Sequence, residues 1–435
     1  MRLSERKFGV PEWVIIALPV TAALGTYLLP IQLGVSFFAF RILVIFVAIF
    51  LVVTGRGIVL NFGSLSRWFF YSGLIWVIWG AFALIWSSLL WGTDIQNGLI
   101  EVLAVIFGFL PAAVLLNLVF RARNGLEALR LGWTLAFVAT ALVALWEVVT
   151  GSHLPGFQEE LLAPSVGLIA MSTFGNPNNY AAFLSLCFPF LIWSLRVATG
   201  WRRAIYLFLS LLLLVALVAT GGRLALVAIG LECLLLILFV SFPWKRLVLA
   251  AAVTVGVLAT VAFPGFMADN ESVKLFRLYS ELTTGGSATI RLNLLKDSVA
   301  LVQQSWGSGI GPANFSHMLM AGQGPYPTEG YVNPHNFWAE IATQYGLLVF
   351  VVFVGWLTLA LWSAWKSRKD ALACNDHRSR LAAETAILGI VGYFLAAAEN
   401  SSYITQQTNW MFLASILVVG CSLSGACPRI AAEPQ

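Results

Sequence analysis

Charged side chains are scarce in this chain: they make up 10% of its 435 residues, whereas hydrophobic residues make up 59%. Soluble domains carry about 25% charged residues, so this shortage excludes an ordinary soluble fold. The mean hydropathy of +0.86 points the same way. We therefore expect an all-α polytopic membrane protein, because a helix satisfies its own backbone hydrogen bonds in lipid.

Cysteine and histidine are also few, with five and four residues. None of the cysteines falls in a predicted outer loop and no CxxC pair occurs, so we expect neither a disulfide framework nor a zinc site. The outer segments lack a DxD motif and any His/Cys/carboxylate cluster, so we expect no metal and no cofactor. No small-residue cleavage site follows the first apolar segment, and no cleavable signal peptide is expected.

About 20 apolar residues are needed to cross a bilayer, and twelve stretches of the sequence meet this requirement. They lie near residues 12–30, 35–54, 67–91, 97–120, 131–150, 179–197, 202–220, 222–241, 246–264, 336–364, 382–400 and 407–424. We accordingly expect four parts: transmembrane helices 1–9 with short loops in 1–264, one large outer loop with amphipathic helices in 265–335, transmembrane helices 10–12 in 336–424, and a tail in 425–435.

The basic residues are unevenly divided between the two sides of the membrane. Arg41 falls inside the second predicted span, five of the 25 basic residues fall in outer segments, and the other 19 fall in inner segments. The outer five are Arg223, Lys274, Arg277, Arg291 and Lys296. By the positive-inside rule, this asymmetry places both termini in the cytoplasm and residues 265–335 outside. The inner basic clusters are then topological anchors, and nucleic acid is not an expected partner.

Three charges lie within or near the ends of predicted spans. A charge inside a span costs about 2.5–3.5 kcal/mol on insertion scales. Arg41 therefore either faces the interior of the bundle or extends its long side chain to the outer interface, and the sequence leaves both open. Glu101 and Glu147 lie near the outer ends of the fourth and fifth spans. Each can pair with Arg41 or an outer arginine, or remain a solvated end charge.

The second outer loop ends in a run of amides, Asn176-Pro177-Asn178-Asn179. Proline pre-sets a turn, and Asn178 or Asn179 can cap the helix that follows. This capped turn is one interpretation. In the other, the amide side chains hydrogen-bond sugar hydroxyls at the membrane surface.

Arg223 follows Gly221-Gly222, which interrupts an otherwise continuous apolar run. It lies on the outer side, where basic residues are rare. It is either an interfacial anchor or, as we favour, part of a site, because a guanidinium suits a bidentate grip on phosphate.

The central loop contains an amphipathic pattern from Ser287 to Gln304, with Arg291, Lys296 and Asp297 off the apolar face. We expect a helix that lies on the membrane surface or against the bundle, with Arg291 directed at a lipid phosphate. The sequence WGSGIGPANF at 306–315 is predicted to be a glycine-rich turn. It is not a P-loop, because the Lys-Ser/Thr pair is absent.

The loop ends in Asn333-Pro334-His335-Asn336. Asn333 fits an N-cap and Pro334 the first helical position, so His335 is predicted in the first turn of span ten. The helix N-terminus favours a neutral imidazole, the form that a general base needs. Asn336, Glu340 and Gln344 then form one polar stripe, which should face protein or water rather than lipid. The alternative is a capped helix entry with an incidental histidine.

Other outer polar residues are weaker candidates for the site. His153 and His317 lack the convergence of polar groups that surrounds His335, so they are less favoured as members. A polar cluster from Glu399 to Gln407 either lines the same site or caps two helices.

These motifs resemble those of the O-antigen ligase and O-antigen polymerase superfamily. His335-Asn336 followed after nine residues by Gly346 is similar to the signature of that superfamily. GNPNNYA in the second outer loop, TGGR at 220–223 and the Arg291 segment before WGSGIGPANF are similar as well. Gly222 stands where the family turn often has serine, so no hydroxyl is expected there.

The resemblance implies an inverting, metal-independent glycosyltransferase of the GT-C type in the bacterial inner membrane, with its active site facing the periplasm. Such enzymes take a glycan from undecaprenyl diphosphate. Ligases pass it to lipid A–core in lipopolysaccharide biosynthesis, and polymerases pass it to another lipid-linked repeat unit. Carried over by position, His335 is the catalytic histidine, and Arg223 and Arg291 are the arginines of the site.

The chemistry of the residues fits this implication. His335 is the candidate general base, and Arg223, Arg291 and Arg41 are the candidates to hold the diphosphate. The candidate residues that line the substrate or acceptor are Asn336, Glu340, Asn176 and Asn178. Membrane lipids and the two lipid-linked substrates are the expected partners.

Several functions remain open at this point. An O-antigen ligase is placed slightly ahead of a polymerase that uses the same donor. A transporter is the alternative of another class, with Arg41 and Glu232 along a translocation path, and a non-catalytic assembly partner would leave His335 without a role. A transferase should bring Arg223, Arg291 and His335 together on the outer face, whereas a transporter needs a polar path to the inner side.

Overall fold

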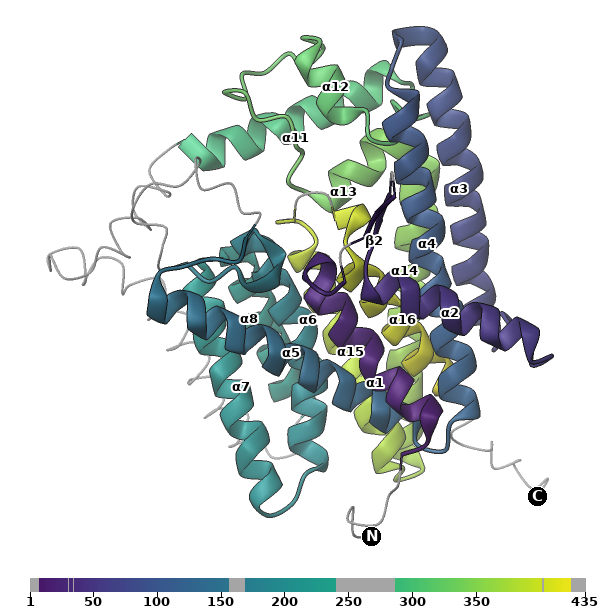
Figure 1. Cartoon of the computed structure of the whole chain (residues 1–435), viewed down its shortest axis with the longest axis vertical. Helices are drawn as coiled ribbons and strands as arrows, with labels where there is room; N and C mark the ends of the chain where they lie inside the picture. The colour runs from purple at the N-terminus through teal and green to yellow at the C-terminus, as the bar shows by residue number, and fades with distance from the viewer. Residues whose placement is uncertain are drawn as a thin grey trace, which may run out of the picture.

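The structure, a computed structural model, describes residues 8–29, 31–33, 35–155, 169–239, 286–400 and 403–423. Long helices form a bundle, and a smaller helical layer lies at one end of it (Figure 1). The bundle contains α1 (Val10–Leu24), α2 (Ala39–Val53), α3 (Ser64–Trp91), α4 (Ile95–Arg121), α5 (Gly125–Thr150), α6 (Pro177–Val197), α7 (Trp201–Thr220), α8 (Arg223–Phe239), α13 (Phe337–Glu340), α14 (Gly346–Ala373), α15 (His377–Ala396) and α16 (Gln407–Ser422). The layer contains α11 (Gly286–Gln304) and α12 (Phe315–Met320).

Eight helical segments among the described residues are long and apolar enough to cross a membrane: α1 with the 3₁₀ turn that extends it to Tyr27, α3, α4, α5, α6, α7, the α13–α14 segment and α15. The polytopic α-helical class predicted from the composition is therefore confirmed. The predicted span 246–264 lies outside the described residues, as does the first part of the predicted outer loop. The count of twelve spans stays a prediction.

The predicted second span, 35–54, differs most from its prediction. Its first residues belong to a small antiparallel hairpin of β1 (Ile31–Leu33) and β2 (Val35–Phe37), with Ile31 opposite Phe37. The remaining helix, α2, has 15 residues, and at 1.5 Å per residue it is about 22 Å long. That is shorter than the roughly 30 Å hydrocarbon core. α2 also lies across α4 rather than along it (Figure 1).

The helices differ in how much of their surface is buried, which distinguishes the centre of the bundle from its rim. Nearly all of α16 is buried, and so is most of α6 and α15. On α7, in contrast, Leu207, Leu211 and Val215 form an exposed apolar stripe. Such a stripe at helical spacing is suited to lipid rather than water. We therefore place α6, α15 and α16 at the centre and α7 at the rim.

The predicted tenth span is interrupted near its start. α13 is followed by a π-helical turn, η6 (Ile341–Tyr345), before α14 begins at Gly346. Gly346 has φ +84°, a backbone conformation that residues other than glycine rarely adopt. The apolar pattern predicted one continuous helix, and it contains no signal for this break.

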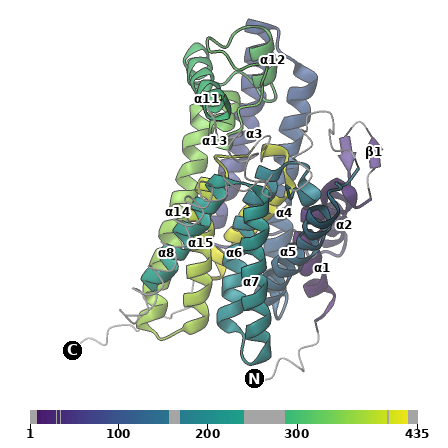
Figure 2. The same cartoon turned by 90° about the vertical axis from the view of Figure 1, so that its left-hand side faces the viewer.

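The glycine-rich turn at 306–315 docks into the interruption. The Ile310 N–H donates to the Thr343 carbonyl (2.9 Å) and the Gly311 N–H to the Gln344 carbonyl (3.1 Å). In return, the Leu347 N–H donates to the Gly307 carbonyl (2.9 Å). A Cβ on Gly309 would lie 2.6 Å from the Gln344 carbonyl oxygen, so only glycine permits this approach. The turn therefore fastens the α11–α12 layer to the bundle, and both views show the layer above α14 and beside the upper end of α3 (Figures 1 and 2).

Candidate functional site

The amphipathic helix predicted in the central loop is present as α11. Leu294 and Leu301 are fully buried and belong to a small hydrophobic cluster that also contains Phe315 and Met318. Asp297, expected off the apolar face, is instead fully buried. Its carboxylate accepts the Tyr326 N–H at 3.0 Å, because the loop after α12 folds over that side of the helix.

Arg291 of α11 lies at the centre of a polar cluster. Its Nη1 is 3.6 Å from Oε1 of Glu399, and the Glu399 side chain is 5% exposed. The Asn178 amide, oriented to satisfy both neighbours, donates to Glu399 Oε1 at 3.3 Å and accepts from Arg291 Nη2 at 3.1 Å. Residues that are distant in the sequence are thus joined by one carboxylate and one guanidinium. Such charge-assisted bonds are stronger than neutral ones.

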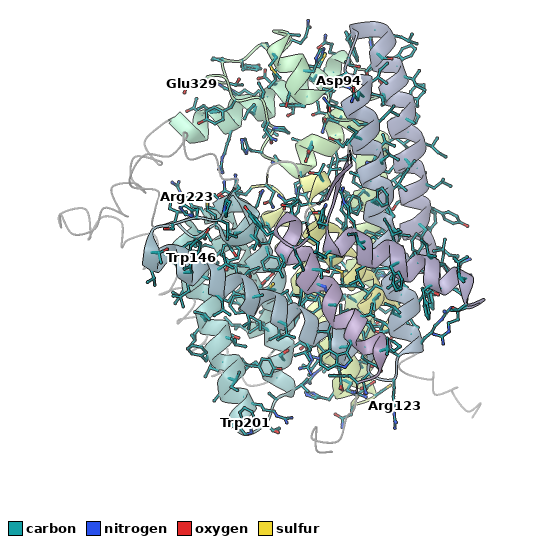
Figure 3. All side chains as sticks on the ribbon, in the orientation of Figure 1. Asp94, Arg123, Trp146, Trp201, Arg223 and Glu329 are labelled. Atoms are coloured by element: carbon teal, nitrogen blue, oxygen red, sulfur yellow. The ribbon has the colours of Figure 1, made fainter. Side chains whose placement is uncertain are left out.

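The start of α8 joins the same cluster. The Leu224 N–H donates to Glu399 Oε2 at 3.1 Å, so the carboxylate connects Arg291 to the N-terminus of α8. Arg223 is the residue before Leu224, and its side chain is exposed. Figure 3 shows Arg223 on the side of the bundle, below α11. Burial raises the pKa of Glu399, and the positive charge of Arg291 opposes this rise.

The N-cap of the helix after the central loop lies three residues later than predicted. Asn336, not Asn333, is the N-cap: its side-chain oxygen accepts the N–H groups of Trp338 (3.0 Å) and Ala339 (3.1 Å). Asn333 accepts the His335 N–H at 2.9 Å. His335 has φ +46° and so lies outside the helix, because a left-handed residue cannot continue a right-handed one.

His335 is half-buried beside this turn, and its ring centroid lies 6.5 Å from that of Tyr331. Burial and then the positive charge of Arg291 lower the pKa of His335 to about 4. The imidazole is therefore neutral at pH 7, as predicted. The cause is burial and a nearby cation rather than a place in the first turn of a helix.

Two of the amides expected to line the site serve as helix caps. The Asn176 side chain accepts the N–H groups of Asn178 (2.9 Å) and Asn179 (3.3 Å), so Asn176 caps α6 and the prediction of Asn178 or Asn179 as the cap is wrong. The side-chain oxygen of Asn336 is occupied in the same way. The Asn178 side chain is left to join Arg291 and Glu399.

Glu340 is a buried carboxylate with partners other than Arg291. It is 5% exposed, and the backbone N–H groups of Tyr403 and Ile404 hydrogen-bond to its carboxylate. Gln344 is also buried, so the polar stripe of this helix faces protein, as expected. No arginine among the described residues forms an ion pair with Glu101; the Tyr345 hydroxyl donates to its Oε1 at 2.9 Å.

The other outer candidates have partners elsewhere. Glu147 accepts the N–H groups of Met171 (2.9 Å) and Ser172 (2.6 Å), and its other oxygen lies 3.1 Å from Nδ1 of His153. These bonds tie the end of α5 to the segment before α6. His317 lies on α12, and His153 thus contacts a carboxylate outside the Arg291 cluster.

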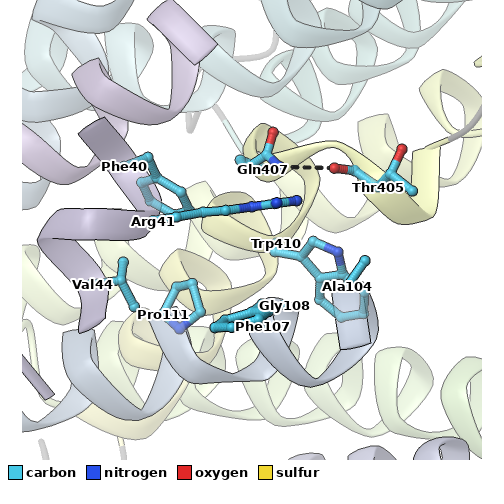
Figure 4. Close-up of a pocket in the computed structure, with 10 residues that line it drawn as sticks. All are labelled: Phe40, Arg41, Val44, Ala104, Phe107, Gly108, Pro111, Thr405, Gln407 and Trp410. Atoms are coloured by element: carbon cyan, nitrogen blue, oxygen red, sulfur yellow. Dashed lines mark hydrogen bonds between the residues drawn. The ribbon is translucent and has the colours of Figure 1, made fainter. Parts of the chain in front are cut away.

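Arg41 lies in a different place from Arg291. It lines a pocket of about 20 Å³ together with Thr405, Gln407 and Trp410, and this pocket is lined neither by His335 nor by the other two candidate arginines, Arg223 and Arg291. Figure 4 shows its side chain extending toward Gln407. Glu232, the other charge considered for a translocation path, packs against Gly392 of α15. Among the described residues, the pocket that Arg41 lines does not include Glu232.

Gly222 is the position that lets α8 approach α6 closely. A Cβ there would lie 2.4 Å from the Ala181 Cβ. We expect Gly222→Ser to lower the free energy of unfolding by about 1–3 kcal/mol through overpacking, measured as a lower melting temperature. Ala181→Gly removes the obstructing methyl group. The double variant should melt higher than Gly222→Ser, although glycine in a helix itself costs about 1 kcal/mol. A double variant that melts lower would contradict the packing explanation.

Sequence reasoning did not assign Glu399 to the site, although it noted the polar cluster in which Glu399 lies. The available signal was its position at the outer end of span eleven, where a buried acid needs a cation. The contacts of Glu399 with Arg291 and Leu224 depend on how α8, α11 and α15 pack against one another. This packing cannot be deduced from a single sequence.

Two comparisons with known proteins bear on the chain. Residues 208–354 match the family model described as O-Antigen ligase. Over 428 residues, the chain is 25% identical to the teichuronic acid biosynthesis protein TuaE of Bacillus subtilis (strain 168), covering 95% of this chain and 84% of that protein. The family match contains Arg223, Arg291 and His335. These comparisons confirm the resemblance predicted from the motifs.

Proposed function

Because this chain resembles the O-antigen ligase superfamily, we propose that it is a glycosyltransferase that moves a glycan from undecaprenyl diphosphate to lipid A–core at the periplasmic face of the inner membrane. The comparisons support the coarser statement that it is a membrane protein of the ligase or polymerase type that processes glycans. The donor, the acceptor, the GT-C architecture, the orientation in the membrane and the role of each residue are our proposal.

The observation that carries the proposal is the cluster of Arg291, Glu399 and Asn178, with His335 close enough to Arg291 for its charge to act on the imidazole. Arg291 is oriented by a buried carboxylate, and the side chain is still 39% exposed. It can therefore contact a substrate from a fixed position. Arg223 is the residue before Leu224, whose N–H donates to Glu399. Glu399 therefore connects the start of α8, where Arg223 lies, to Arg291 of α11.

In the proposed reaction, the acceptor hydroxyl oxygen attacks the anomeric carbon of the glycan. The new carbon–oxygen bond forms as the bond from that carbon to the diphosphate oxygen breaks, and the electron pair remains on the diphosphate. His335 takes the hydroxyl proton. Arg291 and Arg223 stabilise the charge that develops on the leaving group. The attack on the opposite face from the leaving group inverts the anomeric centre.

The pKa of about 4 for His335 belongs to the protein without substrate. A bound diphosphate places negative charge beside Arg291 and offsets the repulsion that the imidazolium would meet. Opposite charge favours the protonated form of histidine. We expect the donor to make His335 more basic, which couples donor binding to readiness for proton transfer.

A polymerase that uses the same donor is the second candidate. The relative in Bacillus subtilis is described as a teichuronic acid biosynthesis protein, which suits a role in assembling surface polysaccharide more generally. A transporter receives less support, because Arg41 and Glu232 lie on different helices and pack against different partners.

The deciding experiment uses purified protein in detergent with an undecaprenyl-diphosphate glycan. Lipid A–core and a second copy of the donor are offered in separate reactions, with the His335→Ala variant in parallel. Transfer to lipid A–core that His335→Ala loses supports the ligase, whereas growth of the donor chain supports the polymerase. Transfer to neither acceptor would contradict the proposal and favour a transporter.

A further inference from the structure

A cavity with several charged residues in its lining lies at the opposite end of the bundle from the Arg291 cluster. Its volume is about 800 Å³, and residues from the ends of α4, α5, α6, α15 and α16 line it. Figure 3 shows Arg123, one of its lining residues, at the end of the molecule opposite Glu329 and the α11–α12 layer. The positive-inside rule assigns this end to the cytoplasm. The proposed transfer reaction makes no use of it.

The charge of the cavity lining is positive. Four arginines line it, namely Arg123, Arg130, Arg196 and Arg378, against two carboxylates, Glu127 and Asp376. Glu127 pairs with Arg378 at 2.8 Å. Asp376 caps α15 by accepting the N–H groups of Arg378 and Ser379. Even with both carboxylates counted, the lining therefore keeps an excess of positive charge.

One of the lining arginines, Arg196, also belongs to a group of charges around a buried carboxylate. Glu384 pairs with Arg196 and with Arg368, and Arg380 lies 4.0 Å from the same carboxylate. Beyond the lining, this group adds the two cations of Arg368 and Arg380 against the one charge of Glu384. Positive charge in a partly buried place is screened less than at an open surface, so a bound anion would gain from the net positive charge of the lining and of this group.

The backbone adds to this field. α5 begins at Gly125, and its N-cap residue Asn124 makes no side-chain capping bond. Asn124, Gly125 and Leu126 all line the cavity. The first N–H groups of a helix point outward and carry partial positive charge, which suits an anion. The Asn124 N–H already donates to Glu12 Oε1 at 3.3 Å, so the N–H groups after Asn124 are the ones that add to the field of the arginines.

Apolar side chains complete the lining and indicate what kind of anion fits. Phe120, Trp193 and Leu381 form part of the wall, and the Arg130 guanidinium lies 6.0 Å from the Trp193 ring centroid. A basic pocket between membrane helices, with apolar walls, suits a lipid phosphate better than a freely soluble ion. We propose that this cavity binds the phosphate headgroup of an anionic phospholipid.

The test uses the full chain in a neutral detergent. Phosphatidylglycerol is titrated while the melting temperature is measured, with phosphatidylcholine and inorganic phosphate as separate arms. The variant is Arg123→Gln/Arg130→Gln. Its matched control is Arg202→Gln/Arg203→Gln at the start of α7, which lies outside the cavity lining but also has one arginine near a tryptophan, with Arg202 5.8 Å from the Trp201 ring centroid.

We expect phosphatidylglycerol to raise the melting temperature of the wild type and of the control at similar lipid concentrations. The double variant should need about ten times more lipid, since each basic residue near the headgroups strengthens binding. Phosphatidylcholine and inorganic phosphate should leave the melting temperature unchanged. Arg123→Gln alone, at an exposed position, should show the same change to a smaller extent, and it tests the proposal should the double variant fold poorly.

Three results would overturn the proposal. Equal stabilisation by phosphatidylcholine would show that lipid charge is irrelevant. An unchanged lipid response in the double variant, or an equal loss in the control, would show that the cavity arginines are not the site. Stabilisation by inorganic phosphate through the same arginines would assign the cavity to a soluble anion instead.

Discussion

His335→Ala is expected to lower the rate of glycan transfer by roughly 10²–10⁴-fold, the usual contribution of a positioned general base. The fold should persist, because the imidazole is half-buried in an outer turn and is not part of the bundle core. Transfer is measured as glycan-linked acceptor formed per minute. His317→Ala, on α12 of the same layer, is the matched control and should retain full activity.

The pH dependence of transfer gives His335 a signature that a structural role would not share. The neutral imidazole is the active form, and its pKa is about 4 in the free protein. The value of kcat/KM, which reports on the free enzyme, should therefore be level near pH 7 and fall as the pH drops through about 4. Since the charge of Arg291 helps to lower this pKa, any activity remaining in Arg291→Gln should begin to fall at a higher pH. A fall at the same pH in both proteins would contradict the electrostatic link.

Arg291→Gln is expected to lower transfer by about 10²–10³-fold, as removal of one group that stabilises a developing anion does elsewhere. It should also destabilise the protein by about 1–3 kcal/mol, because Glu399 is left buried without its cation. Activity is measured as before, and stability as the melting temperature. Lys296→Gln, on the same helix, removes an equal charge outside the cluster and should change neither.

The double variant Arg291→Gln/Glu399→Gln separates these two effects. The side-chain oxygen of the glutamine introduced at position 399 can still accept the Leu224 N–H, and no unpaired charge remains in the cluster. We expect the melting temperature to recover while transfer stays low. Recovery of both would show that Arg291 only stabilises the fold, and it would remove Arg291 from the proposed diphosphate site.

The long helices were predictable to within a few residues. The fourth span, predicted at 97–120, is α4 at Ile95–Arg121, and the sixth, predicted at 179–197, is α6 at Pro177–Val197. Composition suffices there because lipid requires a long apolar stretch and a self-satisfied backbone. The prediction of the second span differs from the structure because an apolar sequence is equally compatible with a β-hairpin followed by a short helix.

The details of the site were less predictable than the helices. Arg291 and Asn178 were identified as candidates, whereas their shared neighbour Glu399 was noted only as part of a polar cluster. The cap was expected at Asn333 because proline follows it, whereas the left-handed backbone at His335 moves the cap to Asn336. Caps and ion pairs depend on backbone angles and on neighbours that are distant in sequence, and hydropathy reports on neither.

The attachment of the α11–α12 layer limits how related proteins can exchange parts. Residues 306–315 hold the layer through backbone hydrogen bonds, which a sequence with glycines at positions 309, 311 and 346 can reproduce. The contact between Arg291 and Glu399 is different, because it needs a particular side chain on each side. A chimera that receives residues 286–335 from a relative would therefore keep its docked shape more readily than its site. The acid at position 399 and the amide at position 178 would have to travel with the transplanted segment, even though neither lies in it.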